Sequence, residues 1–148
     1  MVRLFFKFIL TIFLLLQLQE LLPDNYKVIK QWVDRLPANE YSPAYPFGGY
    51  VLNVNVSTSI HRDWGDLHLC FIIVVSDCIG GELSLVEPGL VLGLRNGDAV
   101  IFPSHEISHL NLHFKGQRAS FVFHSDKSAT QWLEHRNFWS HNHEFKSS

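Results

Sequence analysis

Residues 49 to 124 are a series of short apolar runs separated by turn-forming residues, and this pattern limits the possible fold more than any other feature of the chain. The runs are too short for typical helices and are rich in the β-branched and aromatic residues that favour strands. The candidate strands are Tyr50 to Val56, His61 to Asp63, Leu67 to Val75, Gly81 to Val86, Leu90 to Leu94, Ala99 to Phe102, His105 to Leu112 and Arg118 to His124. The sequence therefore predicts a mainly β domain.

Groups of Gly, Pro, Asn and Asp between these runs predict the turns. They are Ile79-Gly-Gly81, Glu87-Pro-Gly89, Arg95-Asn-Gly-Asp98 and Lys115-Gly-Gln117. Asn96-Gly97 is the strongest hairpin signal among them, because both residues tolerate the left-handed conformation of a tight turn. Short antiparallel strands at nearly regular spacing favour a sandwich or jelly roll, in which two sheets face each other.

Helical patterns flank the β region. Apolar residues at spacings of three and four predict a helix from Asp24 to Arg35, and residues 128 to 138 predict a closing helix. The 148 residues of the chain are enough for one domain, which we place at residues 23 to 148.

Residues 1 to 22 form a hydrophobic segment of their own. Arg3 and Lys7 precede an apolar run from Phe8 to Leu16, which is the order found in signal peptides. The run is well short of the roughly 20 residues that a membrane-spanning helix needs, and no small-residue cleavage site follows it. We expect a helix that packs on the domain or on a partner in an intracellular protein. A signal peptide, or an anchor that contacts a membrane, is the alternative.

Composition excludes some classes of function. A formal net charge of −2 provides no overall basic field, so binding of a nucleic acid would have to come from a local site. Two cysteines are too few for a disulfide framework or a zinc knuckle. Nine histidines are the residues that suggest chemistry.

His61 and Asp63 are two residues apart, so on an extended backbone both side chains project from one face and can bind one ion. Spacing alone is weak evidence, because nine histidines make a chance pairing with an acidic residue unsurprising. A second histidine from a distant strand would complete a two-histidine, one-carboxylate set, which leaves positions on iron(II) open. His105, His109 and His113 all qualify, since steps of four residues place them on one strand face.

Arg118 follows these histidines across a predicted turn, on what would be an adjacent antiparallel strand. A guanidinium binds a carboxylate through two parallel hydrogen bonds. Ser120 shares the face of Arg118, so its hydroxyl can donate to the same carboxylate.

These motifs, in this order, resemble the double-stranded β-helix oxygenases that depend on iron(II) and 2-oxoglutarate. The resemblance rests on His61-Arg-Asp63, Gly80-Gly-Glu-Leu83, Gly97-Asp-Ala-Val-Ile-Phe102, His109 and Arg118-Ala-Ser120, about half of the chain. It implies a cupin-like jelly roll with His61, Asp63 and His109 as metal ligands, because the gap from His109 to Arg118 is the usual one in the family.

The same resemblance assigns roles in binding the co-substrate. Arg118 and Ser120 would hold the far carboxylate of 2-oxoglutarate, and dioxygen would take the last position on the iron. Asn53 or Asn55 would meet 2-oxoglutarate or the substrate from the preceding strand.

Within the superfamily, His61-Arg-Asp-Trp-Gly-Asp66 and Phe102-Pro-Ser-His105 are most similar to fungal, often transposon-associated, relatives of the ten-eleven translocation and J-binding protein enzymes. Those relatives oxidise the methyl group of 5-methylcytosine or thymine in DNA, which implies a DNA substrate and a nuclear location. Asp66, Trp64 and Tyr50 are the candidate substrate contacts. Asp66 can alternatively orient a metal ligand or be a solvated turn residue, and the two aromatic residues can simply pack.

Other functions fit the same motifs. A prolyl-hydroxylase-like oxygenase would act on a protein, and another member of the superfamily on a small molecule. Only about sixty residues precede His61, fewer than usual in the family, so the chain can also be a truncated copy or an inactive jelly-roll binding domain.

Overall fold

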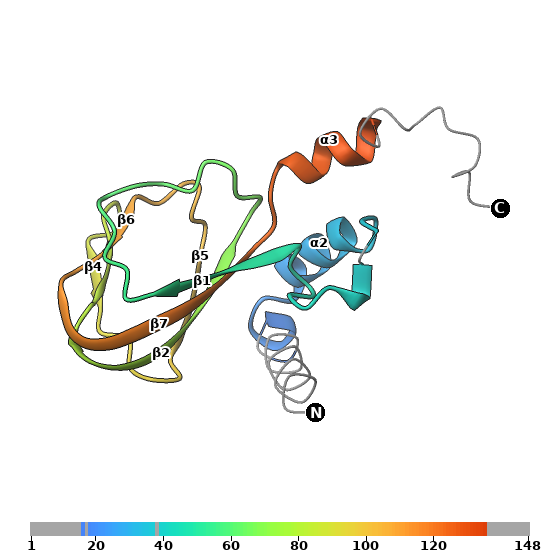
Figure 1. The fold of residues 1–148 in the computed structure, drawn as a ribbon. Coiled ribbons are helices and arrows are strands. Elements are labelled where there is room, and N and C mark those ends of the chain that lie inside the picture. The colour runs from blue at the N-terminus through green and yellow to red at the C-terminus, as the bar shows by residue number, and fades with distance from the viewer. Residues whose placement is uncertain (1–15, 17, 38, 136–148) are drawn as a thin grey trace, which may run out of the picture.

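The computed structural model describes residue 16, residues 18–37 and residues 39–135. The strands are β1 (Gly49–Val54), β2 (Cys70–Gly80), β3 (Leu83–Leu85), β4 (Leu90–Leu92), β5 (Ala99–Phe102), β6 (His109–Asn111) and β7 (Phe114–His124). The helices are α2 (Pro23–Val33), the 3₁₀ turn η1 (Asn39–Tyr41) and α3 (Ser128–His135). Two sheets face each other, and α2 and α3 lie at one end of them (Figure 1).

The strand order is that of a jelly roll. One sheet has the order β1-β7-β2-β5 and the other β4-β3-β6, with antiparallel pairing throughout. An isolated bridge between His61 and His109 extends the second sheet beyond β6 and takes the place of its missing outer strand. The predicted double-stranded β-helix with flanking helices is therefore confirmed, although the predicted strand at His61 is reduced to this single bridge.

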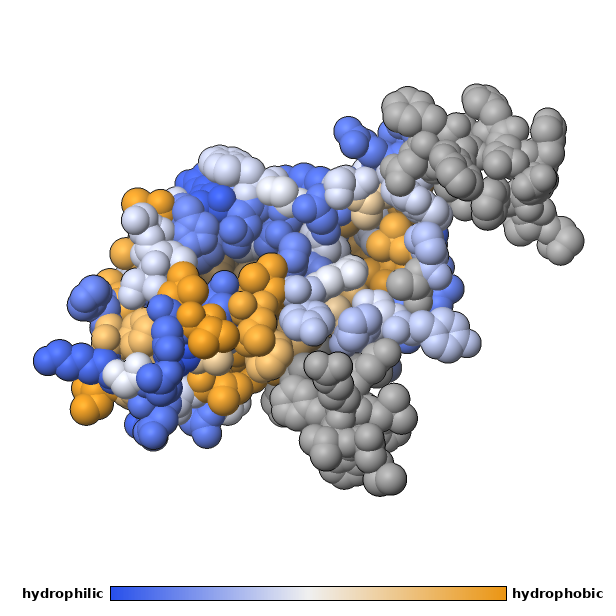
Figure 2. All heavy atoms as spheres, in the orientation of Figure 1, coloured by the Kyte–Doolittle hydropathy of each residue, from blue (hydrophilic) through white to orange (hydrophobic). Residues whose placement is uncertain are grey.

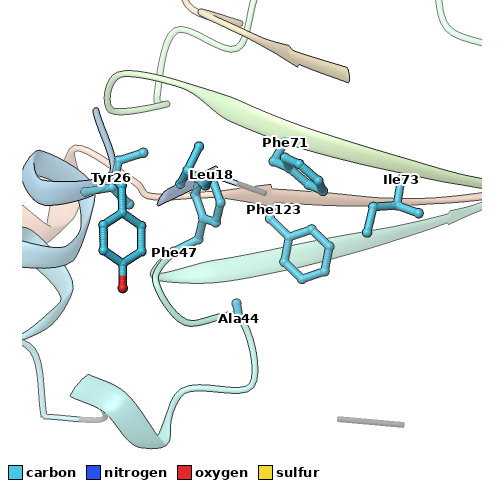
Figure 3. Packing of buried hydrophobic residues seen from close by; sticks show 8 residues of the cluster. Leu18, Tyr26, Ala44, Phe47, Phe71, Ile73 and Phe123 are labelled. Carbon is cyan, nitrogen blue, oxygen red and sulfur yellow. The ribbon is translucent and has the colours of Figure 1, made fainter. Parts of the chain in front are cut away.

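Two apolar cores lie on opposite faces of the four-stranded sheet. The inner core, between the sheets, contains Cys70, Ile72, Val74, Leu83, Leu85 and Phe102. The outer core lies between the sheet and the N-terminal helices and contains Leu18, Tyr26, Ile29, Ala44, Phe47, Phe71, Ile73 and Phe123 (Figure 3). Alternation along β2 sends successive residues to opposite cores, which explains why its first half is apolar at every position.

The helices match the sequence pattern closely. α2 begins at Pro23, one residue before the predicted start, because proline fits the first turn of a helix, where its missing N–H is not needed. Tyr26, Ile29 and Val33 recur on its buried side. α3 begins at Ser128 as predicted, and the last residues of the predicted helix, 136 to 138, lie outside the described part of the chain.

Leu18 belongs to the predicted hydrophobic segment and is fully buried in the outer core. It supports the expectation that this segment packs on the domain, and the folded unit extends at least to this residue. Among the described residues, no helix has the length and apolar character needed to cross a membrane. Residues 1–15 and 17, on which the signal or anchor alternative depends, are not described.

The outer face of the four-stranded sheet is only partly covered. The exposed apolar side chains on it include Leu52 and Val54 of β1 and Val75 of β2. Figure 2 shows apolar residues gathered over these strands, away from the helical end. The helices thus cover only part of this face.

Two predictions about strands were wrong. Lys115 to Gln117 is not a turn, because β7 runs unbroken from Phe114 to His124 and pairs with β2 from Phe114 to Phe123. Gly116 keeps a positive φ of 115° there, and a Cβ at this position would collide with the carbonyl oxygen of Asp77. The predicted strand from His105 to Leu112 shrinks to β6, because the backbone turns at residues 104 to 106.

Candidate metal centre and anion site

A pocket of about 240 Å³ opens between the two sheets. The four-stranded sheet supplies its polar wall through alternate residues of β1 and β7, and the second sheet supplies the opposite wall. Its lining is Val51, Asn53, Thr58, His61, Asp63, Asp66, Ile72, Leu83, Leu94, His109, Asn111, Arg118, Ser120, Val122 and His124. Most of the predicted site residues therefore meet in one cavity.

His61, Asp63 and His109 form a cluster at one end of this pocket. One ligand atom from each side chain lies within 4.8 Å of the others. The Nε2 atom of His61 is 3.7 Å from one carboxylate oxygen of Asp63, and Nε2 of His109 is 3.4 Å from the other. The two imidazole ring centroids are 4.3 Å apart. Three such ligands on one side of an ion suit a metal that keeps its remaining positions open.

Backbone hydrogen bonds set this cluster. His61 and His109 exchange both of their N–H to carbonyl bonds, at 3.1 and 2.9 Å, so their side chains leave the sheet on the same side. The N–H of Asp63 donates to the carbonyl of Ser104 at 3.1 Å, which fixes the carboxylate beside the imidazoles. Few backbone hydrogen bonds hold the segment that contains His61 and Asp63, since neither residue belongs to a regular strand.

Each imidazole is oriented by a carbonyl next to it in the chain. Nδ1 of His61 is 2.8 Å from the carbonyl oxygen of Ser59, and Nδ1 of His109 is 2.9 Å from that of Ile107. Because a carbonyl accepts only, Nδ1 must carry the proton in the neutral ring, and Nε2 keeps its lone pair. Both Nε2 atoms therefore face Asp63 as metal-binding donors.

Electrostatics couples Asp63 to His109. The contact with His109 keeps the pKa of the Asp63 carboxyl below its ordinary value. Burial by itself would lower the pKa of His109, but the bonds to Asp63 and to the carbonyl of Ile107 raise it above its ordinary value.

Arg118 lies on a different wall of the pocket, and no carboxylate among the described residues balances its charge. Its side chain is 5% exposed, and its guanidinium donates to the amide oxygen of Asn111 at 3.2 Å. Burial lowers its pKa, yet a guanidinium stays charged in proteins. Within the part of the chain that the structure describes, Arg118 forms no ion pair with a carboxylate. A buried cation of this kind calls for an anion.

Ser120 and Asn53 lie beside Arg118 in the lining of the pocket. They are register partners across β7 and β1, so their side chains stand next to each other on the inner face. Gly81 lets Arg118 pass, because a Cβ there would lie 3.2 Å from Cδ of the arginine.

The relation between His109 and Arg118 differs from the prediction. They do not sit on adjacent paired strands, since β6 and β7 belong to different sheets. They face the same cavity because the two sheets stack. The prediction that both serve one site is unaffected, but the reason is sheet packing.

Asn55 does not line this pocket, in contrast to the prediction that it contacts 2-oxoglutarate or substrate. β1 ends at Val54, and Asn55 has a positive φ of 54°, which turns its side chain out of the strand alternation. Its amide oxygen accepts a hydrogen bond from the backbone N–H of Arg118 at 2.9 Å.

The structure separates the three histidines that the sequence left open. His105 lies in the turn before β6, where Nε2 is 3.3 Å from Glu106, and His113 lies in the connection after β6. Neither lines the pocket. His109 alone of the three faces Asp63.

The predicted aromatic contacts, Trp64 and Tyr50, lie outside the pocket. Tyr50 points to the outer face of the sheet, with its ring 5.8 and 6.1 Å from those of Phe123 and Phe121. Trp64 is 67% exposed near the metal cluster, and the guanidinium of Arg62 lies 5.3 Å from its ring. Packing explains Tyr50, while Trp64 remains available to a partner.

Asp66 is buried in the pocket wall, so its interpretation as a solvated turn residue is wrong. It accepts a hydrogen bond from Ser104 at 2.5 Å and lies 3.0 Å from Nδ1 of His124. Asp66 raises the pKa of His124 despite the burial of the imidazole.

Sequence analysis missed His124, Asn111 and Thr58 as pocket residues. Strand alternation from Arg118 and Ser120 points to His124, which lies on the same face of β7. No local signal marks Asn111, because it enters the pocket from the other sheet.

Outside the pocket, a charged cluster ties the two ligand-bearing segments together. Arg62 donates to Ser108 at 2.9 Å and to Glu87 at 2.6 Å, while Glu87 accepts from the N–H and the hydroxyl of Ser108, both at 2.7 Å. Bonds from Ser108 and then Arg62 lower the pKa of Glu87 to about 2. Arg62 lies between His61 and Asp63 in the chain, and Ser108 directly precedes His109. The cluster therefore connects the two segments that carry the metal ligands, on the side away from the pocket.

The residues present fit both groups that the family uses. Two neutral imidazole nitrogens and one carboxylate are a suitable donor set for iron(II). The buried Arg118, which has no carboxylate partner in the described part of the chain, suits the far carboxylate of 2-oxoglutarate together with Ser120 beside it.

Comparison with known proteins gives fold matches. No protein-family model matches the sequence, and none of the curated proteins is similar to it in sequence. The structure of NgTET1 in complex with 5mC DNA matches with a TM-score of 0.62 and 16% identity over 69% of this chain. An oxidoreductase of the 2OG-Fe(II) oxygenase family from Burkholderia pseudomallei has a TM-score of 0.44 and 20% identity, over 55% of this chain and 51% of that one.

This chain spans 42% of the NgTET1 chain that it matches. The match agrees with the strand order and confirms, at the level of the fold, the resemblance carried by the sequence motifs. The chain has the double-stranded β-helix fold that it shares with NgTET1, and a histidine, aspartate and histidine cluster meets in the pocket between its sheets.

Proposed function

We propose that this chain is an iron(II)- and 2-oxoglutarate-dependent dioxygenase that oxidises a C–H bond of its substrate. One observation carries the proposal. A single pocket holds a three-residue metal-ligand cluster together with a buried arginine that has no carboxylate partner among the described residues. Each feature alone has a structural explanation. Their presence in one cavity suits the binding of a metal ion together with a dicarboxylate that chelates it.

Iron(II) with 2-oxoglutarate and dioxygen supplies the oxidising chemistry, in which the co-substrate becomes succinate and carbon dioxide as the substrate gains one oxygen atom. The chain's own residues bind and orient. His61 and His109 offer Nε2, fixed by their carbonyl partners, and Asp63 offers its carboxylate. Two neutral ligands and one charged ligand leave the ion with a net positive charge, which favours an anionic co-substrate.

Arg118 and Ser120 form the second anchor. The guanidinium provides paired donors and the hydroxyl a further one, so these two residues would hold the far carboxylate of 2-oxoglutarate. Ile72, Leu83 and Val122 give the lining of the same pocket an apolar part. Low local polarity strengthens both charged contacts.

We propose DNA carrying 5-methylcytosine or thymine as the substrate, and with it a nuclear location. The fold match to a TET protein in complex with 5mC DNA supports this choice. Trp64, exposed beside the metal cluster and stacked on Arg62, offers an aromatic and cationic surface for a base. Asp66 and His124 add a polar pair in the pocket wall.

Turnover tests the activity. We expect the full chain with iron(II) to convert 2-oxoglutarate to succinate, detected by mass spectrometry. His61→Ala and Asp63→Ala should abolish conversion, whereas His113→Ala, outside the pocket, should not. Conversion that persists in either ligand variant would remove those residues from the ligand set.

The substrate is tested by incubating the protein with methylated DNA and, separately, with proline-containing peptides. A gain of one oxygen on the methyl group of DNA supports the proposal, while the same gain on peptide favours a prolyl-hydroxylase-like enzyme. A folded chain that binds neither iron(II) nor 2-oxoglutarate would identify an inactive jelly-roll binding domain instead.

A further inference from the structure

Asn55 stands where the chain leaves the four-stranded sheet and turns toward the metal cluster. β1 ends at Val54, and only five residues separate Asn55 from His61. The β1–β7 register, which pairs Val54 with Ala119, would next pair Asn55 with Arg118. This residue therefore lies between the strand that carries the anion anchor and the segment that carries the metal ligands.

Asn55 completes the rung with Arg118 in an unusual way. Its backbone N–H donates to the carbonyl of Arg118 at 2.7 Å, as in a regular ladder. The return bond, from the N–H of Arg118, goes to the side-chain oxygen of Asn55 at 2.9 Å. A positive φ of 54° has turned the Asn55 carbonyl away, and the side chain replaces it. Asparagine tolerates this backbone conformation better than most residues and carries the acceptor as well.

Among the described residues, β2, the strand on the other side of Arg118, offers no replacement for these backbone hydrogen bonds. In an antiparallel sheet, the N–H and carbonyl of one residue point to the same neighbouring strand. Ser76 is the β2 partner of Arg118, and its N–H points the other way, to Asn96 at 3.3 Å. Among the residues that the structure describes, Asn55 is therefore the one that holds both backbone groups of Arg118.

A further hydrogen bond fixes the amide of Asn55. Its Nδ2 donates to the side-chain oxygen of Gln117 at 2.7 Å, which leaves Oδ1 facing the N–H of Arg118. We call these hydrogen bonds of Asn55 with Arg118 and Gln117 the clamp. The clamp lies next to an irregular position in β7, since Gly116 has a positive φ of 115°. Arg118 is the first inward-facing residue after this irregularity that lines the pocket.

From this geometry we propose that Asn55 is a positioning residue for Arg118, a role that rests on the proposed function because the guanidinium is the group that would bind 2-oxoglutarate. Asn55 does not touch the pocket. It holds the backbone of Arg118 through two hydrogen bonds, at the point where the chain leaves β1 toward His61.

Three variants test this role in the full chain. Asn55→Gly accepts the positive φ but removes the side-chain clamp. Asn55→Asp keeps the acceptor for Arg118 and removes the donor to Gln117. Asn39→Gly is the matched control, because it changes another asparagine with a positive φ, 31°, in the 3₁₀ turn η1 outside the pocket.

The first measurement is titration of 2-oxoglutarate into the manganese(II)-loaded protein by calorimetry. We expect the Kd for 2-oxoglutarate to rise about tenfold in Asn55→Gly, as for loss of one hydrogen bond that orders a charged group. Asn55→Asp should stay within about threefold of the parent. The Kd for manganese(II) is the control for a general loss of structure, and it should not change. An unchanged Kd for 2-oxoglutarate in Asn55→Gly would overturn the inference.

The second measurement does not depend on ligand binding. Amide hydrogen exchange, read by NMR, should be slow at Arg118 in the parent and in Asn55→Asp, and fast in Asn55→Gly. Slow exchange in Asn55→Gly would overturn the clamp. If the parent does not bind 2-oxoglutarate, the proposed function fails, and exchange at Arg118 still decides whether Asn55 holds this residue. If Asn55→Gly does not fold, Gln117→Ala takes its place. We then expect a smaller rise in the Kd for 2-oxoglutarate and a smaller acceleration of amide exchange at Arg118. The absence of both changes would count against the clamp.

Discussion

The two ends of the pocket are built differently. The metal end consists of side chains from an irregular segment and from the short strand β6, and the side chains of His61 and Asp63 are 39% and 37% exposed. The arginine end lies on β7, which pairs with strands on both sides, and Arg118 is 5% exposed. The metal end is thus held by few backbone bonds and is partly open to solvent, while the other end is buried on a strand that pairs on both sides. We infer that the metal completes its own site, whereas the anion enters a site that is already formed.

Loss of a metal ligand should have the largest effect. Asp63→Ala removes the single charged ligand and leaves two imidazoles that cannot hold the ion, so iron(II)-dependent succinate formation should fall to background. The fold should persist, because Asp63 is not in either core. Circular dichroism is the control. Retained turnover would show that the metal end is not where we place it.

Arg118→Met separates the two ends. The Kd for 2-oxoglutarate should rise about a hundredfold, because a desolvated charged contact is lost. The Kd for the metal should stay the same. In the absence of ligands the variant should be more stable than the parent by about 1 kcal/mol, since a buried cation bonded to a neutral amide is replaced by an apolar chain of similar length. Thermal unfolding measures this effect. A less stable variant would mean that Arg118 supports the fold and is not held for a ligand.

Metal affinity should depend on pH. The raised pKa of His109 means that its Nε2 keeps a proton above the pH at which a free imidazole would lose it. A metal has to displace that proton, so affinity should fall as pH falls through this pKa, by about tenfold per unit below it. Manganese(II) titrations from pH 6 to 8, with His113→Ala as control, measure the profile. A flat profile would exclude His109 as a ligand.

The smallest effect should come from the charged cluster behind the metal end. Arg62→Ala breaks the bonds to Ser108 and Glu87 without touching the pocket. We expect roughly three- to tenfold weaker metal binding, at the low end of what supporting residues contribute, because the ligand segments gain freedom. Binding of 2-oxoglutarate to the metal-loaded variant should change less. Equal losses at both ends would contradict their independence.

Much of the site was predictable because it depends on alternation within strands. His61 with Asp63, and Arg118 with Ser120, are pairs two residues apart, and each pair faces one side as predicted. The prediction failed where the backbone leaves regular geometry. Asn55 turns out of its strand through a positive φ, and His105 lies in a turn that the apolar pattern did not reveal. Lys115 to Gln117 looked like a turn because glycine signals a reversal, yet here it permits close contact with β2.

The sequence by itself determined the fold class, the order of the motifs and the residue types of both anchors, because these depend on local periodicity and on side-chain chemistry. The tertiary structure decided which histidine faces Asp63, that Asn111 joins the pocket, and that Arg118 lacks a carboxylate partner among the described residues. The physical reason is that β6 and β7 lie in different sheets. Their residues meet through the packing of one sheet on the other. The spacing of residues along the chain contains no information about the distance between residues of two packed sheets.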